Sequence, residues 1–148
     1  MMSADGRGFF VASGTSRPTR IPVPTAFKAL SSDTGGQYTF GDHHLTEDYP
    51  LHIHHREDEG IYMLEGRMTA VVGDDTFSMG PGDFIFMPRG VPHSLTRASE
   101  SPVRFVFVST PGGFEHLMED IVELVGAGQS PSSAEWQALE AKHGWAWL

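Results

Sequence analysis

The sequence has 148 residues and a mass of 16.2 kDa, which is room for one domain with a substantial core. Its 10 basic residues stand against 19 acidic ones, and the formal charge of -9 disfavours nucleic acid as a partner because the molecule repels polyphosphate. No apolar run approaches the ~20 residues of a membrane span, and the start lacks a signal-peptide core. We therefore predict a cytoplasmic protein without membrane contacts.

The first 24 residues, 1–24, are rich in Gly, Ser, Thr, Arg and Pro without a sustained period, and we predict an N-terminal arm there. Residues 25–111 break into short runs of β-branched and aromatic residues separated by turn signals such as Gly80-Pro81-Gly82. Strands at this short, regular spacing predict an all-β sandwich or barrel. The expected strands are residues 26–31, 37–45, 51–55, 60–64, 68–72, 76–79, 83–87, 93–96 and 103–109.

The remaining segment, residues 112–148, changes its hydrophobic period. Apolar residues recur at the three-and-four spacing of an amphipathic helix over residues 114–125. A second helix is expected over residues 132–143, with Ser132 as its capping residue and Gly144 as its end. Both helices are expected to pack on the β core, so that the chain forms one structural domain overall.

The histidines carry the strongest chemical signal. The alternation of apolar and imidazole side chains over residues 51–54 places His52 and His54 on one face of a strand. Glu59 follows at the start of the next apolar run, so a tight turn can return its carboxylate to the imidazoles. His93 follows two prolines and opens a strand that can neighbour the first. Since the chain has no cysteine, such a site would use nitrogen and oxygen ligands, which suit one divalent transition metal: Fe, Mn, Ni, Co, Cu or Zn. A His-x-His pair alone is more often a solvated polar surface.

These spacings resemble the two sequence motifs of the cupin superfamily. The matching segments are His52-x-His54-x4-Glu59-x6-Gly66 and Gly82-x5-Pro88-x-Gly90-x2-His93. The wider run over residues 35–114 is similar to small single-domain cupins of the quercetin-dioxygenase-like group. The resemblance implies a single cupin barrel, a double-stranded β-helix or jelly roll, with one or two C-terminal helices. It also implies that His52, His54, Glu59 and His93 bind the metal, and that Glu59 takes part in catalysis by accepting the substrate proton.

Two positions depart from the family pattern, and neither is a ligand. Thr46 replaces a glycine before the first motif, and Arg97 replaces an asparagine after the second. Outside the motifs, the remaining histidines have separate interpretations. We expect His55 to be a surface or second-layer residue, His43 and His44 to be possible pocket residues, and His116 and His143 to face solvent.

Aromatic and apolar side chains on shared strand faces are candidates for a substrate pocket, with plain core packing as the alternative for each. The candidate pocket residues are Tyr38, Phe40, Met63, Phe84, Phe86, Phe105 and Phe107. An apolar, aromatic pocket suits a flat small molecule whose deprotonated hydroxyl binds the metal.

Three functional hypotheses follow. The first is a metal-dependent dioxygenase acting on a small enolic or phenolic substrate, polyketide-like or flavonoid-like. The second is a non-oxidative cyclase, isomerase or lyase on the same scaffold, with the metal as Lewis acid. The third is a small-molecule-binding cupin without turnover. By analogy with cupins of this size we also expect a homodimer, paired through a sheet edge with residues 9–23 as an added strand.

Overall fold

The computed structural model describes residues 6–148, so the first five residues of the expected arm lie outside the described residues. Its elements follow the predicted order. The strands are β1 (Ala26–Ala29), β2 (Thr39–His44), β3 (Tyr49–His54), β4 (Asp58–Glu65), β5 (Met68–Val72), β6 (Asp75–Met79), β7 (Phe84–Met87), β8 (His93–Arg97), β9 (Arg104–Thr110) and β10 (Trp145–Trp147). The helices are α1 (Phe114–Gly126) and α2 (Ala134–His143).

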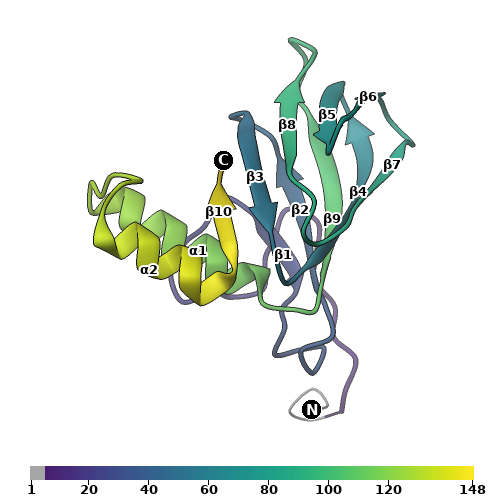
Figure 1. The fold of residues 1–148 in the computed structure, drawn as a ribbon. Coiled ribbons are helices and arrows are strands. Elements are labelled where there is room, and N and C mark those ends of the chain that lie inside the picture. Colours follow the sequence, from purple (N-terminus) through teal and green to yellow (C-terminus); the bar gives the residue numbers. More distant parts are fainter. Residues whose placement is uncertain (1–5) are drawn as a thin grey trace.

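The strands of residues 6–148 form two antiparallel sheets that face each other as a sandwich (Figure 1). One sheet, here called sheet A, has the order β1-β2-β9-β4-β7, and the other, sheet B, has the order β10-β3-β8-β5-β6. Consecutive strands often lie in different sheets, so the chain winds around the barrel instead of completing one sheet first. The predicted all-β barrel with C-terminal helices is confirmed.

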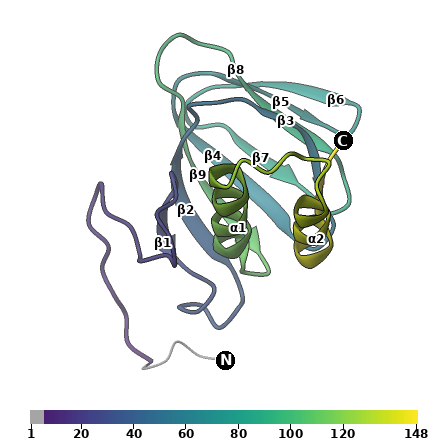
Figure 2. The same cartoon turned by 90° about the vertical axis from the view of Figure 1, so that its left-hand side faces the viewer.

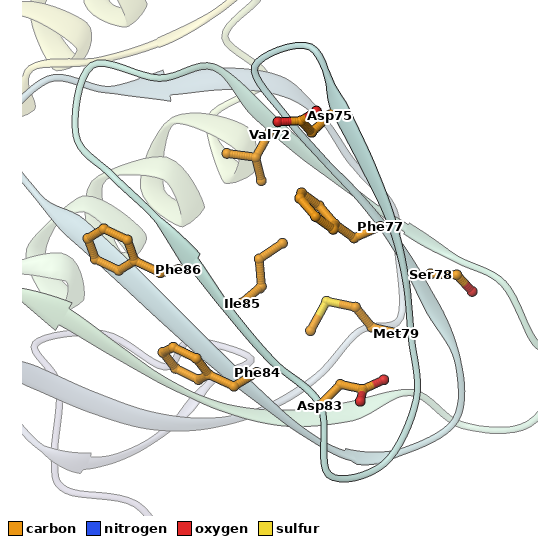
Figure 3. A pocket seen from close by; sticks show the side chains of 9 residues that line it. All are labelled: Val72, Asp75, Phe77, Ser78, Met79, Asp83, Phe84, Ile85 and Phe86. Carbon is orange, nitrogen blue, oxygen red and sulfur yellow. The ribbon is translucent and has the colours of Figure 1, made fainter.

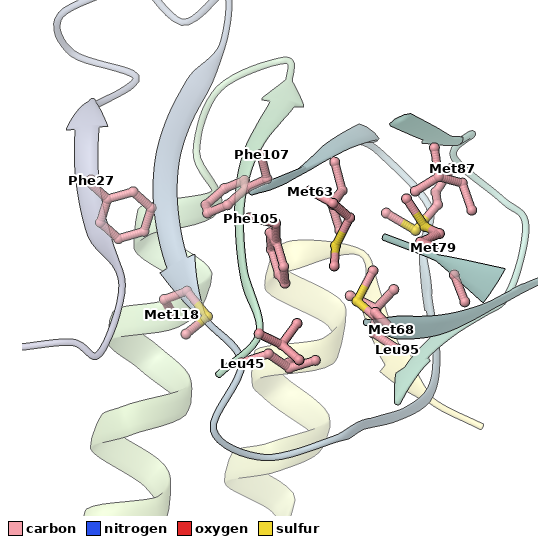
Figure 4. Close-up of a cluster of buried hydrophobic side chains, with 14 of the residues drawn as sticks. Phe27, Leu45, Met63, Met68, Met79, Met87, Leu95, Phe105, Phe107 and Met118 are labelled. Carbon is pink, nitrogen blue, oxygen red and sulfur yellow. The ribbon is translucent and has the colours of Figure 1, made fainter. Parts of the chain in front are cut away.

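The core fills the space between the two sheets, and methionines from both sheets meet in it (Figure 4). Met63 of β4 and Met68 of β5 are 0% exposed, and Met79 and Met87 are also buried. Their unbranched side chains fill irregular gaps between strands that twist relative to one another. Phe105 of β9 packs into the same cluster, in agreement with the period-2 alternation of its strand.

A second buried cluster joins both helices to one flank of the sandwich (Figure 2). It unites Leu117 of α1 with Trp136 of α2 and Trp145 of β10. The cap of α2 differs by one residue from the prediction, because the Ser133 hydroxyl accepts the backbone N–H of Trp136 at 3.2 Å. Ser132, the expected cap, instead hydrogen-bonds through its hydroxyl to Ser130.

Helix α1 is also anchored to sheet A by a buried carboxylate in its first turn. Glu115 is 2% exposed and accepts hydrogen bonds from the backbone N–H of Ser31 at 2.7 Å, from the Ser31 hydroxyl, and from the Thr39 hydroxyl at 2.6 Å. Burial raises the pKa of Glu115, but the hydrogen bonds from Ser31 and Thr39 outweigh it and lower the pKa below its ordinary value. The ionised carboxylate therefore fixes where α1 starts.

The sequence did not indicate β10. This three-residue strand pairs antiparallel with β3, placing Trp145 opposite His54 and Trp147 opposite His52. Three residues are too few for an alternation pattern to stand out. As a result, the last segment of the chain forms the edge of sheet B beside the strand that carries two of the candidate ligands (Figure 1).

Residues 6–25 contain no strand and run outside the sandwich beside β1 (Figure 2). The backbone N–H of Arg17 donates to the carbonyl of Phe27 at 2.7 Å, and the Lys28 ammonium donates to the carbonyls of Ala12 and Thr15. Neither helix in the described part of the chain has the length and apolar character needed to cross a membrane.

Candidate metal centre

Three imidazoles from two neighbouring strands meet inside the sandwich. His52 and His54 lie on β3, and His93 begins β8, where it pairs directly opposite His52. One ring nitrogen of each lies within 4.8 Å of the others, and the residues are 7%, 3% and 1% exposed. The alternation along β3 and the approach through Pro92 thus bring together the histidines predicted to share a site.

Backbone carbonyls fix which nitrogen of the His52 and His93 rings faces the neighbouring imidazoles. A carbonyl can only accept, so Nδ1 of His52 must donate to the carbonyl of Pro50 at 2.7 Å, and Nδ1 of His93 donates to that of Val91 at 3.3 Å. Nδ1 of His54 lies 3.5 Å from the Glu57 carboxylate. His52 and His93 are thereby left with the lone pair of Nε2 free, the arrangement that ligand histidines show.

Glu59 reaches the same cluster from the opposite sheet. It lies on β4, and its Oε2 is 3.8 Å from Nε2 of His54 and 3.5 Å from Nε2 of His93. Burial raises the pKa of Glu59, but the adjacent His93 ring and the potential of His54 and His52 outweigh it and lower the pKa. The carboxylate is therefore an anionic oxygen donor beside three imidazoles.

The donor set fits a divalent first-row transition metal. Burial, followed by the neighbouring His93 ring, lowers the pKa of His52 to about 4, so this imidazole is neutral at pH 7 and its lone pair is available. Nε2 of His93 is buried without a hydrogen-bond partner among residues 6–148, although a buried polar atom ordinarily has one. A cation held by the Nε2 atoms and Glu59 would give Nε2 of His93 a partner and would balance the carboxylate charge.

A cavity of about 400 Å³ opens onto this cluster. His52, His54 and Glu59 line one end of it, and helices α1 and α2 with β10 supply most of its apolar wall. The wall residues include Phe114, Leu117, Met118, Ile121, Trp136, Trp145 and Trp147. Its volume falls within the range of small-molecule sites, and such sites are mostly apolar with a few convergent polar groups.

The candidate pocket residues lie elsewhere. Met63 is in the core, and Tyr38, Phe84 and Phe86 are exposed on the outside, at 41%, 62% and 55%. Phe40 is half-buried on sheet A with its strand neighbours. Strand alternation shows which side chains share a face but not which face borders the cavity, and the cavity wall comes from the C-terminal segment instead.

Phe105 and Phe107 come nearer the site, because they line a small inner cavity together with Glu59 and His43. Tyr49 lines both cavities and was not singled out from the sequence, although it begins the strand that carries the first histidine pair. Trp147 was also missed, because the three residues Trp-Ala-Trp of β10 are too few to show an alternation.

The other histidines divide between interior and surface. His43 is 5% exposed, with Nδ1 3.0 Å from the Thr25 hydroxyl and Nε2 2.7 Å from the Tyr49 hydroxyl. His44, His55 and His116 are exposed, as expected for the last two. The expectation for His143 was wrong, because its side chain is 11% exposed and contacts the Asp120 carboxylate at 2.7 Å.

The two departures from the motif pattern are accommodated locally. The backbone N–H of Arg97 donates to the Asp48 carboxylate at 2.9 Å, and its guanidinium contacts the same oxygen at 3.3 Å. This pairing joins the end of β8 to the turn before β3, the turn in which Thr46 lies. The strands that carry the candidate ligands are thus tied together at this end.

Comparisons with known proteins agree with this fold. Residues 45–109 match the cupin domain family. The chain is 32% identical over 69 residues to quercetin 2,3-dioxygenase of Bacillus subtilis (strain 168), which is 47% of this chain and 20% of that protein. It is 30% identical over 73 residues to an uncharacterized protein of Methanocaldococcus jannaschii, covering 49% and 58% of the two chains. The chain thus spans a fifth of the length of the Bacillus subtilis relative and little more than half of the Methanocaldococcus jannaschii relative.

Solved structures show the same architecture. The polyketide cyclase RemF from Streptomyces resistomycificus superposes with a TM-score of 0.58 at 24% identity, over 70% of this chain and 80% of that one. A protein with a double-stranded β-helix domain from Klebsiella pneumoniae superposes with a TM-score of 0.56 at 17% identity, over 71% and 90%. At these identities the likeness concerns the fold. Residues 45–109 thus match the cupin domain family, and the described residues have the cupin fold.

Proposed function

We propose that this cupin is a metal-dependent dioxygenase that acts on a small enolic or phenolic substrate. The observation that carries the proposal is the position of His52, His54 and Glu59 in the wall of an aromatic cavity of ligand size, with His93 grouped beside the two histidines. A divalent metal bound there would supply a Lewis acid for a substrate oxygen and a redox centre for dioxygen. The Bacillus subtilis relative, a quercetin 2,3-dioxygenase, supports the oxidative form of the reaction.

The cavity wall favours a flat, uncharged substrate. Trp147 and Trp145 lie with their rings 5.7 Å and 6.0 Å from the His52 ring, so an aromatic ligand placed against them would lie beside the metal ligands. The acidic side chains of Glu47 and Asp48 also line the cavity. Arg97 pairs with Asp48, so Glu47 is the group that would repel a carboxylate or phosphate, whereas a neutral phenol or enol meets no such barrier.

Two side chains can handle the substrate proton and oxygen. Glu59 is ionised and lines the cavity, so it can accept the proton of a substrate hydroxyl. Burial raises the pKa of Tyr49, which therefore keeps its proton at pH 7, and the hydroxyl is held 2.7 Å from His43. Where Nε2–H of His43 donates to the Tyr49 hydroxyl and Nδ1 accepts from the Thr25 hydroxyl, Tyr49 is left to donate its own proton toward a bound oxygen.

The test is a screen of neutral enols and phenols with the metal-loaded protein, with substrate loss and oxygen uptake measured together. We expect equimolar loss of substrate and oxygen in the wild type and in His55→Ala, whose side chain is exposed directly after the end of β3. Glu59→Gln should lose at least ~100-fold in turnover, because it removes both a base and an anionic ligand. Substrate loss without oxygen uptake would replace the dioxygenase with the non-oxidative cyclase, isomerase or lyase, and ligand binding without turnover would leave a binding protein.

A further inference from the structure

His54 is held differently from the other two histidines of the candidate metal centre. The Nδ1 atoms of His52 and His93 donate to backbone carbonyls two residues earlier in the chain. Nδ1 of His54 is buried and has no hydrogen-bond partner within residues 6–148. A buried polar atom without a partner is costly, so we looked for an acceptor beside this nitrogen.

The group beside it is the carboxylate of Glu57. Its Oε2 lies 3.5 Å from Nδ1 of His54 and is itself buried without a hydrogen-bond partner in the described part of the chain. A closure of about 0.5 Å would bring the two atoms to the usual length of an N–H···O hydrogen bond. At the other nitrogen of the ring, Nε2 lies 3.8 Å from Glu59. One ring nitrogen of His54 thus meets Glu57, and the other meets the metal centre.

The residues on both sides of Glu57 are tied down by hydrogen bonds. The guanidinium of Arg56 donates to two carbonyls in the last turn of α2, at 2.6 Å and 3.2 Å. The Asp58 carboxylate accepts the backbone N–H of Arg89 at 2.9 Å and its guanidinium at 3.0 Å. The turn over residues 55–57, between β3 and β4, is therefore held at both of its flanks, which restricts where the Glu57 side chain can lie.

Glu57 has cations nearby but does not pair with them. It lines a second cavity, of about 430 Å³, together with Arg20, Arg56 and Lys142. Arg20 and Lys142 pair with carboxylates of α1, and Arg56 is engaged at α2. Among the residues that the structure describes, the salt-bridge partner of Glu57 is His54. A carboxylate that contacts an imidazole in preference to three available cations is placed to act on that imidazole.

We propose that Glu57 is a positioning residue: its carboxylate accepts the Nδ1–H of His54 and thereby directs the Nε2 lone pair of that ring to the metal. A carboxylate behind a ligand histidine fixes the tautomer and orientation of the ring and raises its basicity. Glu57 is one of the four residues between His54 and Glu59, where the sequence motif specifies no residue type. The proposal rests on the metal-binding part of the proposed function and not on the reaction, so it is tested without turnover.

The experiment measures the zinc affinity of the full chain by competition with a chromophoric chelator. Glu57→Ala should raise the zinc Kd by about 10–100-fold, because His54 loses its acceptor. Glu57→Gln should raise it less, since an amide oxygen can still accept from Nδ1–H. The control is Asp75→Asn, which also removes one negative charge and should leave the Kd unchanged. Asp75 is exposed in the groove between β6 and β7, two strands away from His93 (Figure 3).

Proton NMR of the zinc-loaded protein separates positioning from the effect of charge alone. The Nδ1–H of His54 should give a downfield signal that exchanges slowly with water in the wild type. This signal should move upfield in Glu57→Gln and be lost to exchange in Glu57→Ala. The Nδ1–H signals of His52 and His93 should stay in place, because their acceptors are backbone carbonyls. Far-UV circular dichroism shows whether each variant is folded.

An unchanged zinc Kd in Glu57→Ala overturns the proposal. Equal losses of affinity in Glu57→Ala and Glu57→Gln, with the His54 signal unmoved, also overturn it, because Glu57 would then act through its charge. If Glu57→Ala does not fold, Glu57→Gln decides: an upfield shift of the His54 signal supports the proposal, and an unmoved signal overturns it. A wild type that binds no zinc overturns the metal centre and this proposal with it.

Discussion

The buried His43 should make the metal-free protein lose stability in mild acid. Burial, followed by the nearby His44, lowers the pKa of His43 to about 4, whereas an unfolded histidine titrates near 6.5. Above pH 6.5 His43 is neutral in both the folded and the unfolded chain, so its titration does not change the free energy of unfolding. As the pH falls from 6.5 toward 4 only the unfolded chain gains this proton, so stability declines. The difference of about 2.5 pKa units corresponds to ~3 kcal/mol lost by pH 4, after which the effect levels off.

The perturbation is His43→Gln, which keeps a polar side chain near the hydroxyls of Thr25 and Tyr49 but cannot titrate. Urea unfolding in the presence of a chelator, at about pH 7.5, 6 and 5, gives the free energy of unfolding of both proteins. The variant should be less stable than the wild type near pH 7.5. The difference in their free energies of unfolding should narrow by ~2 kcal/mol at pH 5, because only the wild type is destabilised by protonation of His43 in the unfolded state. His55→Gln, at an exposed histidine that does not affect the pKa of His43, is the control and should leave the pH dependence of the wild type unchanged. A gap that stays constant with pH would refute the reasoning.

Two further changes test the packing that positions the site, each with a matched control and urea unfolding as the measurement. Glu115→Ala leaves the donors of Ser31 and Thr39 without their acceptor and should lower the free energy of unfolding by ~3 kcal/mol. Glu123→Ala, on an exposed turn of α1, should lower it by under ~0.5 kcal/mol. Equal losses would contradict the anchoring role of Glu115. Gly41→Ala places a Cβ 2.5 Å from the buried Phe107 ring and should lower the free energy of unfolding by ~1–3 kcal/mol. Gly60→Ala should cost less, because its Cβ would stand 3.0 Å from the exposed Phe84 ring, which can turn away, and 3.4 Å from Val108, an ordinary contact. The reverse order would show that the interior of sheet A is not tightly packed.

Local patterns predicted most of the barrel. Strand β5 lies at residues 68–72 as expected, and β8 and α1 begin where their patterns start. Alternation also predicted that His52 and His54 share one strand face, because the side chains of residues i and i+2 in a strand point to the same side. The spacing to Glu59 and His93 depended on two turns whose glycines and prolines are visible in the sequence.

Local sequence patterns did not predict which residues form the walls of the cavity. Which strand face borders the cavity depends on where α1 and α2 dock, and that depends on long-range contacts such as Glu115 with Thr39. Strand β10 is too short to show a period, although it brings Trp147 to the His52 ring. The apolar residues Phe84 and Phe86 alternate like core residues, yet they lie on the outside of an edge strand. Sequence alone did not separate a core face from an apolar outer face.

Metal content, measured by inductively coupled plasma mass spectrometry on untagged protein purified without chelator, tests the central claim most directly. The account predicts about one equivalent of a first-row transition metal per chain in the wild type and in His55→Ala, and its loss from a folded His93→Ala. A wild type without metal in every preparation, or a His93→Ala variant that keeps the full equivalent, would contradict it.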